Sequence, residues 1–279
     1  MKNLHQRIGL FDSGVGGLTV LREMYRQMPT ESLLYFADSA RLPYGARSSE
    51  EILQFVREIL DWMCMQDVKM VIMACNTSSA LALETVRNEY DIPILGVILA
   101  GARAAVKQGQ RIGVIATAAT VKSHAYCQAI QEINPHSQVW EVPCPEFVRL
   151  IEQNQMHTDS TREIAQQYLA PLIEAQIDTL VYGCTHYRHL DQTIRHLLPS
   201  SVQIIDPAEH IVIAAETELS LLGLRNNQFS LPTSYYVSGV PEQFASLSQQ
   251  WLGYYPRVTQ VKPTELSSAM MSLNEGAQV

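Results

Sequence analysis

The sequence has little positive charge, no long apolar run and few cysteines. Its 279 residues contain 20 Lys and Arg against 28 Asp and Glu, which gives a formal net charge of -8. Because no basic run offsets this charge, we expect no general binding to nucleic acid or to an anionic membrane. No apolar stretch approaches the roughly 20 residues of a bilayer-spanning helix, and residues 1–10 lack an apolar signal core. We therefore expect a cytoplasmic protein.

The cysteines are too few and too irregularly spaced to form a disulfide framework or a metal-binding motif with paired ligands. The chain has five cysteines and contains neither C-x-x-C nor H-x-x-x-H. A zinc site could still use Cys184 and His186, although a third ligand is hard to nominate. We assign the remaining cysteines outside the two motifs described below, Cys64, Cys127 and Cys144, to the protein interior, where free cysteine behaves as a small apolar side chain.

Short apolar runs alternate with helix-length amphipathic stretches along the chain. This pattern predicts an α/β protein with mainly parallel sheets flanked by helices on both faces. Strands are predicted at residues 7–11, 33–37, 70–74, 111–116, 138–142, 179–182, 202–205 and 234–237. Helices are predicted at residues 17–27, 49–65, 78–89, 101–107, 121–133, 145–154, 160–175, 187–197 and 207–222.

A weak internal repeat predicts two similar domains. R-I-G-L-F-D-S begins at Arg7 and R-I-G-V-I-A-T begins at Arg111, and a cysteine motif follows each after roughly 70 residues. We interpret this as a diverged duplication. The first domain is predicted to comprise residues 1–97 plus 207–279 and the second residues 98–206. If the strand ends of the two domains face each other, the active site lies in the cleft between them.

The two cysteine motifs are alike. Cys75 in M-A-C-N-T-S-S and Cys184 in Y-G-C-T-H-Y each end an apolar run, and capping residues that open a helix-periodic stretch follow. A helix N-terminus favours thiolate over thiol. Two such thiols predict an acid and a base that face one substrate from opposite sides, as a racemase requires. Buried structural cysteines, or a single nucleophilic cysteine with a histidine base, are the alternatives.

The turn F-D-S-G-V-G-G-L-T follows the first strand. Asp12 and Ser13 lie at its carboxyl end, and the glycines would let the backbone approach a small anionic ligand. A dinucleotide site is an alternative, with Gly14, Gly16 and a ribose-binding Asp38, but Thr19 replaces its third glycine. A third interpretation is a purely structural turn.

The segment A-D-S-A-R-L-P-Y-G follows the second predicted strand. It is too polar and too rich in turn formers for a helix or strand. Because it shares a sheet edge with the other motifs, Pro43, Tyr44 and Gly45 could close over a substrate. An ordinary connection between strand and helix is the alternative.

Together these motifs resemble a known family. D-S-G-V-G-G-L-T-V, P-Y-G, A-C-N-T and G-C-T-H-Y, in this order, resemble the glutamate racemases of the aspartate/glutamate racemase superfamily. The resemblance runs from Ile8 to about Ile213 and includes G-V-I-A-T-x-x-T-V and C-P-x-F-V. Arg149 departs from the family, which usually has proline there.

The resemblance implies particular roles. Cys75 and Cys184 would carry the protons, assisted by Asp12 and His186 respectively. Substrate contacts would come from Asp12, Ser13, Pro43, Tyr44, Gly45, Asn76, Thr77, Thr117, Thr120, Glu152, Thr185 and His186. The family supplies D-glutamate for peptidoglycan and uses no pyridoxal phosphate, metal or flavin. We expect a homodimer whose partner is glutamate, with no requirement for nucleic acid or a membrane.

Other functions remain open at this stage. Within the superfamily, the protein could racemise aspartate or another small acid. Gly14, Gly16 and Asp38 leave a nucleotide-binding oxidoreductase as an alternative, and a regulatory protein without turnover is a third. For a racemase, an ordinary thiol pKa near 8.5 needs only a modest downward shift, which helix N-termini and His186 could supply, whereas burial alone would raise it.

Overall fold

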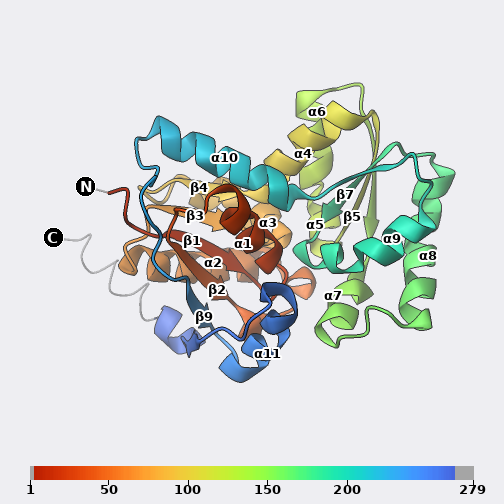
Figure 1. Ribbon diagram of the computed structural model, residues 1–279. Coiled ribbons are helices and arrows are strands. Elements are labelled where there is room, and N and C mark those ends of the chain that lie inside the picture. The colour runs from red at the N-terminus through yellow and green to blue at the C-terminus, as the bar shows by residue number, and fades with distance from the viewer. Residues whose placement is uncertain (1–2, 268–279) are drawn as a thin grey trace.

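The computed structural model describes residues 3–267 and contains two parallel sheets in separate halves of the molecule (Figure 1). The six-stranded sheet has the order β10-β9-β2-β1-β3-β4 and the four-stranded sheet the order β6-β5-β7-β8. The strands of the first are β1 Ile8–Asp12, β2 Leu33–Ala37, β3 Met70–Met73, β4 Ile94–Gly96, β9 Ser234–Val237 and β10 Val258–Gln260. Those of the second are β5 Arg111–Ala116, β6 Gln138–Pro143, β7 Thr179–Gly183 and β8 Gln203–Ile205.

Helices cover both faces of the six-stranded sheet, and together they form what we call the first domain. Successive strand residues point to opposite faces, so Ile8 and Leu10 enter one core while Phe11 enters the other. The first core lies under three helices, α1 Leu18–Gln27, α10 Pro207–Leu221 and α11 Pro241–Leu252. The second lies under α2 Ser49–Met65 and α3 Asn76–Val86. A sheet buried on both faces explains the continuous apolar runs in the sequence.

The four-stranded sheet has the same three layers and forms the second domain. Ile112 and Val114 on β5 pack under one group of helices, whereas Ile115 packs under the other. The helices on the first face are α4 Val97–Gln108 and α6 Ala125–Ile133. Those on the second face are α7 Pro145–Glu152, α8 Asp159–Glu174 and α9 Asp191–Leu197. The α/β fold class with two parallel, helix-flanked sheets is therefore confirmed.

The chain crosses between the sheets twice. It leaves the first sheet from β4 into α4, and it returns from β8 into α10. The two crossing helices approach closely at Gly101, where a Cβ atom would lie 2.9 Å from Pro207 Cγ. The domain bounds 1–97 plus 207–279 and 98–206 remain a prediction, and residues 1–2 and 268–279 lie outside the described residues.

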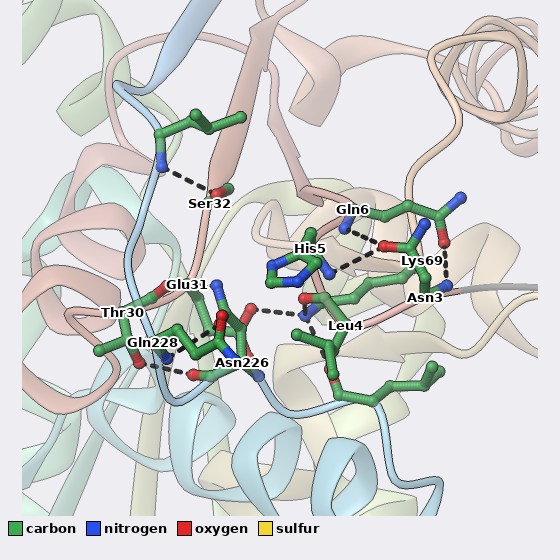
Figure 2. A network of polar contacts seen from close by, with 12 residues as sticks. Asn3, Leu4, His5, Gln6, Thr30, Glu31, Ser32, Lys69, Asn226 and Gln228 are labelled. Atoms are coloured by element: carbon green, nitrogen blue, oxygen red, sulfur yellow. Dashed lines mark hydrogen bonds and ion pairs between the residues drawn. The ribbon is translucent and has the colours of Figure 1, made fainter.

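A buried ion pair fixes the segment that leads from α10 to β9 (Figure 2). Lys69 Nζ lies 2.6 Å from Glu31 Oε2, and both side chains are fully buried. The ammonium also donates to the carbonyl oxygens of Leu4 and Leu224, at 2.7 and 2.8 Å. Glu31 Oε1 accepts a bond from the Asn226 backbone N–H at 2.8 Å. Because both charges are paired and hydrogen-bonded to backbone groups of Leu4, Leu224 and Asn226, the ion pair holds the segment between α10 and β9 in one position.

Several predicted elements differ from the structure. Strands β4 and β10 are missed by the prediction, because three residues are too few to show a period, and the 12-residue helix α11 is missed as well. The single helix predicted at residues 121–133 is two helices, α5 Ala118–Ser123 and α6, because His124 adopts a left-handed conformation between them. The loop after β2 contains two 3-10 turns, Ser39–Arg41 and Tyr44–Ala46.

The prediction for the cysteine motifs is wrong in one respect. Cys75 is itself the N-cap of α3, so Asn76 and Thr77 belong to the helix rather than capping it. After Cys184 the chain forms a 3-10 helix, η3 Thr185–Leu190, and the α-helix α9 begins only at Asp191. The 3-10 helix replaces the first turn of the helix predicted over residues 187–197, and α9 forms the rest, so only Cys75 directly precedes an α-helix. None of the helices within residues 3–267 combines the length and apolar character needed to cross a membrane.

Candidate active site

The carboxyl ends of the two sheets meet around a small cavity. Its volume is about 80 Å³, well below the roughly 300–1,000 Å³ of pockets for drug-sized ligands, so it suits a small substrate. Both candidate thiols line it, Cys75 from the first sheet and Cys184 from the second. The lining residues are Ser13, Pro43, Tyr44, Gly45, Ala46, Cys75, Asn76, Thr77, Thr117, Ala118, Pro145, Val148, Cys184, Thr185 and His186.

Three of the predicted substrate contacts, Asp12, Glu152 and Thr120, do not line the cavity but form hydrogen bonds to residues that do. Thr185 Oγ1 donates to Asp12 Oδ2 at 3.0 Å, so a carboxylate of the first domain orients a hydroxyl of the second. Glu152 Oε1 lies 2.8 Å from His186 Nε2. Thr120 shares hydrogen bonds with the hydroxyls of Thr117 and Thr77, at 3.0 and 3.3 Å. These three side chains position the residues that face the cavity.

The Cys75 thiol lies between β3 and α3 and is 5% exposed. Burial, followed by the negative charge of Asp12, raises the pKa of Cys75 to about 12, although hydrogen bonds from Ser78 oppose the shift. This differs from the modest lowering that we expected. Desolvation and a neighbouring carboxylate outweigh the helix N-terminus, so Cys75 is a thiol at neutral pH.

The Cys184 thiol has a cationic neighbour instead. Cys184 Sγ lies 3.9 Å from His186 Nδ1, and the other ring nitrogen of His186 faces Glu152. Burial disfavours the charged imidazole, but the contacts with Cys184 and Glu152 outweigh burial and raise the pKa of His186 well above its usual range. His186 is therefore held as an imidazolium beside Cys184.

The glycines of the first turn allow the two domains to approach each other. A Cβ atom at Gly16 would lie 2.4 Å from Thr185 Oγ1 and 2.5 Å from His186 Nδ1. One at Gly14 would lie 2.8 Å from Glu152 Oε1. The glycines thus face Thr185, His186 and Glu152 of the second domain, and the space beside them is filled by protein.

The dinucleotide interpretation of that turn is wrong at its acidic residue. Asp38 is fully buried and accepts a hydrogen bond from the Tyr44 hydroxyl at 2.5 Å. Arg41 Nη1 lies 3.6 Å from the same carboxylate. Asp38 therefore holds the Tyr44 loop in place and is not exposed to a ribose.

Asp12 bridges the two half-sites. Its carboxylate accepts the Gly14 backbone N–H at 2.9 Å in addition to the Thr185 hydroxyl. Burial raises the pKa of Asp12, while His186 and these hydrogen bonds oppose the shift. Asp12 also raises the pKa of Cys75, so it acts on the thiol of the first domain and bonds to the residue that follows Cys184.

Sequence reasoning missed several residues of this site. Tyr126 donates to Asn76 Oδ1 at 2.6 Å and fixes that amide, and Ser78 bonds to Cys75. Ala46, Ala118, Pro145 and Val148 complete the cavity wall. Pro145 and Val148 fall within the C-P-x-F-V match, which was the available signal. Nothing in the sequence indicates the role of Tyr126.

The remaining candidates lie away from the cavity lining. Cys144 is buried and its carbonyl oxygen accepts the Tyr187 hydroxyl at 2.8 Å, while Cys64 and Cys127 are partly buried. Arg149 lies on α7 with an exposed side chain, 3.6 Å from Glu146. Across residues 3–267, no three His, Cys, Asp or Glu side chains group as a metal site.

Comparisons of the sequence with known proteins point to one family. The Asp/Glu/hydantoin racemase family model matches residues 8–215. A glutamate racemase of Gloeothece citriformis is 65% identical over 264 residues, covering 94% of this chain and 95% of that protein.

Solved structures show the same fold over nearly their full length. A glutamate racemase isoform of Bacillus anthracis superposes with a TM-score of 0.91 at 37% identity, covering 94% of this chain and 99% of that one. The Francisella tularensis enzyme, solved in complex with D-glutamate, gives 0.89 at 33% identity, covering 95% and 99%. Because the family model spans most of the chain and these relatives cover 94–95% of it, the chain belongs to the Asp/Glu/hydantoin racemase family.

Proposed function

We propose that this protein is a glutamate racemase that interconverts L- and D-glutamate by proton transfer between two cysteines, without a cofactor. The observation that supports this most directly is the placement of Cys75 and Cys184, which line one small cavity from two different sheets. Inversion of an α-carbon needs a base on one face and an acid on the other. The relatives named above are glutamate racemases, which favours glutamate over aspartate as substrate.

The proposed reaction conserves protons at each step. One cysteine, as thiolate, removes the α-proton, so a C–H bond breaks as an S–H bond forms. The other cysteine, as thiol, then protonates the opposite face of the carbanion and becomes the thiolate. The two sulfurs have exchanged states, and the enzyme is ready for the reverse reaction. With no cofactor to delocalise the carbanion, positioning and fixed dipoles must lower the barrier.

The two thiols have different neighbours. His186 places a positive charge beside Cys184, whereas burial and Asp12 keep Cys75 protonated. We infer that Cys75 is a thiol before substrate binds and must lose its proton to act as the base. The α-ammonium group of a bound amino acid would add positive charge to the cavity and so help Cys75 to release its proton.

Polar groups around the cavity provide the binding contacts that we propose for glutamate. Asn76 and Thr77 stand at the N-terminus of α3, where backbone N–H groups and the helix dipole favour a carboxylate. The hydroxyls of Thr77 and Thr117 lie 2.9 Å apart, so their orientation is set before substrate binds. Thr185 is oriented in the same way by Asp12.

The cellular role that we propose is the supply of D-glutamate for peptidoglycan. We further propose a cytoplasmic homodimer, which sedimentation equilibrium at several protein concentrations would test. A panel of glutamate, aspartate and other small acidic amino acids would separate the proposed substrate from the alternatives within the superfamily.

Incubation with L-glutamate in deuterium oxide tests the mechanism. Circular dichroism should decay to zero as racemisation proceeds, and the D-product should carry deuterium at its α-carbon, because the donating thiol exchanges with solvent between turnovers. Substrate recovered early should carry much less. Activity should survive dialysis against a chelator and treatment with hydroxylamine, which removes pyridoxal phosphate. Equal deuterium in both enantiomers from the first turnovers would instead indicate a single exchanging base.

A further inference from the structure

One aromatic stack links the catalytic 3-10 helix to the first domain at a distance from the cavity. The ring of His189 on η3 stacks on Trp251 of α11, with centroids 3.4 Å apart and an interplanar angle of 28°. His189 belongs to the second domain, whereas α11 packs on the first sheet. Trp251 contacts the apolar cores of both domains. The stack therefore joins the two halves of the molecule.

The η3 helix is thus fixed to the first domain at both ends. At its start, Thr185 donates to Asp12 and lies against Gly16. At its end, His189 lies against Trp251. His186, which flanks Cys184, lies between these two contacts. Within the second domain, Glu152 holds the His186 ring and the Cys144 carbonyl oxygen holds Tyr187, both at 2.8 Å, so the stack supplies the contact that fixes the end of η3 against the first domain.

Trp251 is itself held rigidly. Its helix ends at Gly253 in a left-handed conformation, with φ of 77°, which turns the chain sharply. The Tyr254 hydroxyl that follows lies 2.6 Å from that of Tyr235 on β9, which lies 2.7 Å from that of Tyr25 on α1. This chain of hydroxyls anchors the end of α11 to the first domain.

Stacking, rather than ring-nitrogen chemistry, explains where His189 lies. Its Nε2 atom is buried and has no hydrogen-bond partner among residues 3–267. Burial, together with the positive charges of His186, Arg22 and Arg188, lowers the pKa of His189 to about 3. A neutral ring is the form that packs flat on an indole without the cost of a buried charge.

We propose that His189 and Trp251 are positioning residues that hold His186 beside Cys184, so that the Cys184 half-site works only while the two domains are joined through this stack. The proposal rests on the racemase function proposed above. It assigns a role in catalysis to Trp251, which does not line the cavity.

Kinetics of four variants and one control test this. Trp251→Leu and His189→Leu each remove one ring, and we expect kcat to fall between about 10- and 100-fold, as misplacement by about 1 Å can cause. Trp251→Phe and His189→Phe keep a stacking ring and should restore most of the activity. Trp140→Leu is the matched control, because its indole stacks on Arg111 within the second domain, and it should keep wild-type kcat.

Alkylation supplies a readout that does not require turnover. Iodoacetamide labelling of the empty protein, followed by peptide mass spectrometry, gives the rates at Cys75 and Cys184 separately. Both thiols share one cavity, so a general loosening changes both rates together and leaves their ratio constant. Displacement of His186 removes a cation from Cys184 alone, and the Cys184:Cys75 ratio should fall several-fold in Trp251→Leu and His189→Leu.

The outcomes separate the two proposals. A wild-type enzyme without racemase activity would refute the proposed function, and the labelling ratio would then decide the positioning role alone. An unchanged ratio with wild-type kcat in both Leu variants overturns the positioning role. The positioning role is also overturned if the loss of activity in these variants is fully explained by a smaller folded fraction, as measured by thermal melts. If Trp251→Leu does not fold, His189→Leu with its Phe counterpart decides the question.

Discussion

The close approach of Gly16 to the second domain makes its replacement by alanine a sharp test of the site geometry. The added Cβ would lie 2.4 Å from Thr185 Oγ1 and 2.5 Å from His186 Nδ1, whereas ordinary van der Waals contact begins at 3.4 Å. These atoms must therefore separate by about 1 Å. Neither neighbour can rotate away freely, because Thr185 is bonded to Asp12 and His186 to Glu152.

A shift of this size should reduce activity more than stability. Overpacking of this kind costs roughly 1–3 kcal/mol of unfolding free energy. Displacement of a catalytic group by about 1 Å can cost on the order of 100-fold in rate, so we expect kcat/KM of Gly16→Ala to fall about 100-fold. Because the equilibrium constant of racemisation is 1, kcat/KM must fall equally in both directions.

Circular dichroism of each pure enantiomer measures the two rates, and thermal melts measure the stability. Gly9→Ala is the matched control, since its Cβ would lie 2.9 Å from Met63 Sδ in the interior of the first domain, away from the site. It should lose stability but keep its turnover. Near-wild-type kcat/KM in a folded Gly16→Ala would refute the inference that the glycine turn sets the distance between the domains.

Further predictions concern the thiols, their neighbours and pH. Cys75→Ser and Cys184→Ser should each lower kcat by about 10²- to 10⁴-fold, because a hydroxyl is too weak an acid to exchange protons at neutral pH, and a folded variant with near-wild-type racemisation would disprove the two-thiol assignment. Asp12→Asn and His186→Asn should lower kcat more than they raise KM. Because kcat/KM stays equal in both directions, any difference between the two directions should appear in α-deuterium isotope effects measured from each enantiomer. A change confined to KM would mean that both residues only contact the substrate. Because the pKa of His186 is raised in the folded protein, this side chain stabilises the fold fully below its unfolded pKa near 6.5, and the stabilisation is lost as pH rises through its folded pKa. Urea unfolding should therefore show that His186→Asn loses more unfolding free energy, relative to wild type, at about pH 6 than at about pH 9. The lowered pKa of His189 predicts the opposite pH dependence, because the contribution of this side chain to the free energy of unfolding is present above about pH 6.5 and is lost as pH falls. The wild type should therefore lose stability relative to His189→Phe between about pH 7 and pH 4. The same trend for both histidines would contradict the assigned charge states.

Local patterns were sufficient to predict most of the architecture. The continuous apolar runs that became β1, β3, β5 and β7 are buried on both faces, and such runs are typical of parallel sheets under two helical layers. The two cysteine motifs fell at strand ends for the same reason, since polar turn residues followed each run. Strands as short as Ile94–Gly96 and Val258–Gln260 could not be predicted, because their pairing depends on neighbouring strands rather than on their own residues.

The sequence by itself also predicted which motifs share an edge of a sheet. Parallel strands bring their carboxyl ends to one edge, so the first turn, the Tyr44 segment and Cys75 could be placed together. The individual substrate contacts came from the family resemblance, and only the structure separates the residues that line the cavity from Asp12, Glu152 and Thr120, which lie behind them.

Only the tertiary structure decided the electrostatics and the contacts between domains. The pKa of Cys75 is raised rather than lowered because burial and Asp12 act on it together, and neither effect can be read from its neighbours in the chain. Gly16 meets His186, and His189 meets Trp251, across the domain boundary. Such contacts depend on how two separately packed sheets are placed against each other, which no local periodicity records.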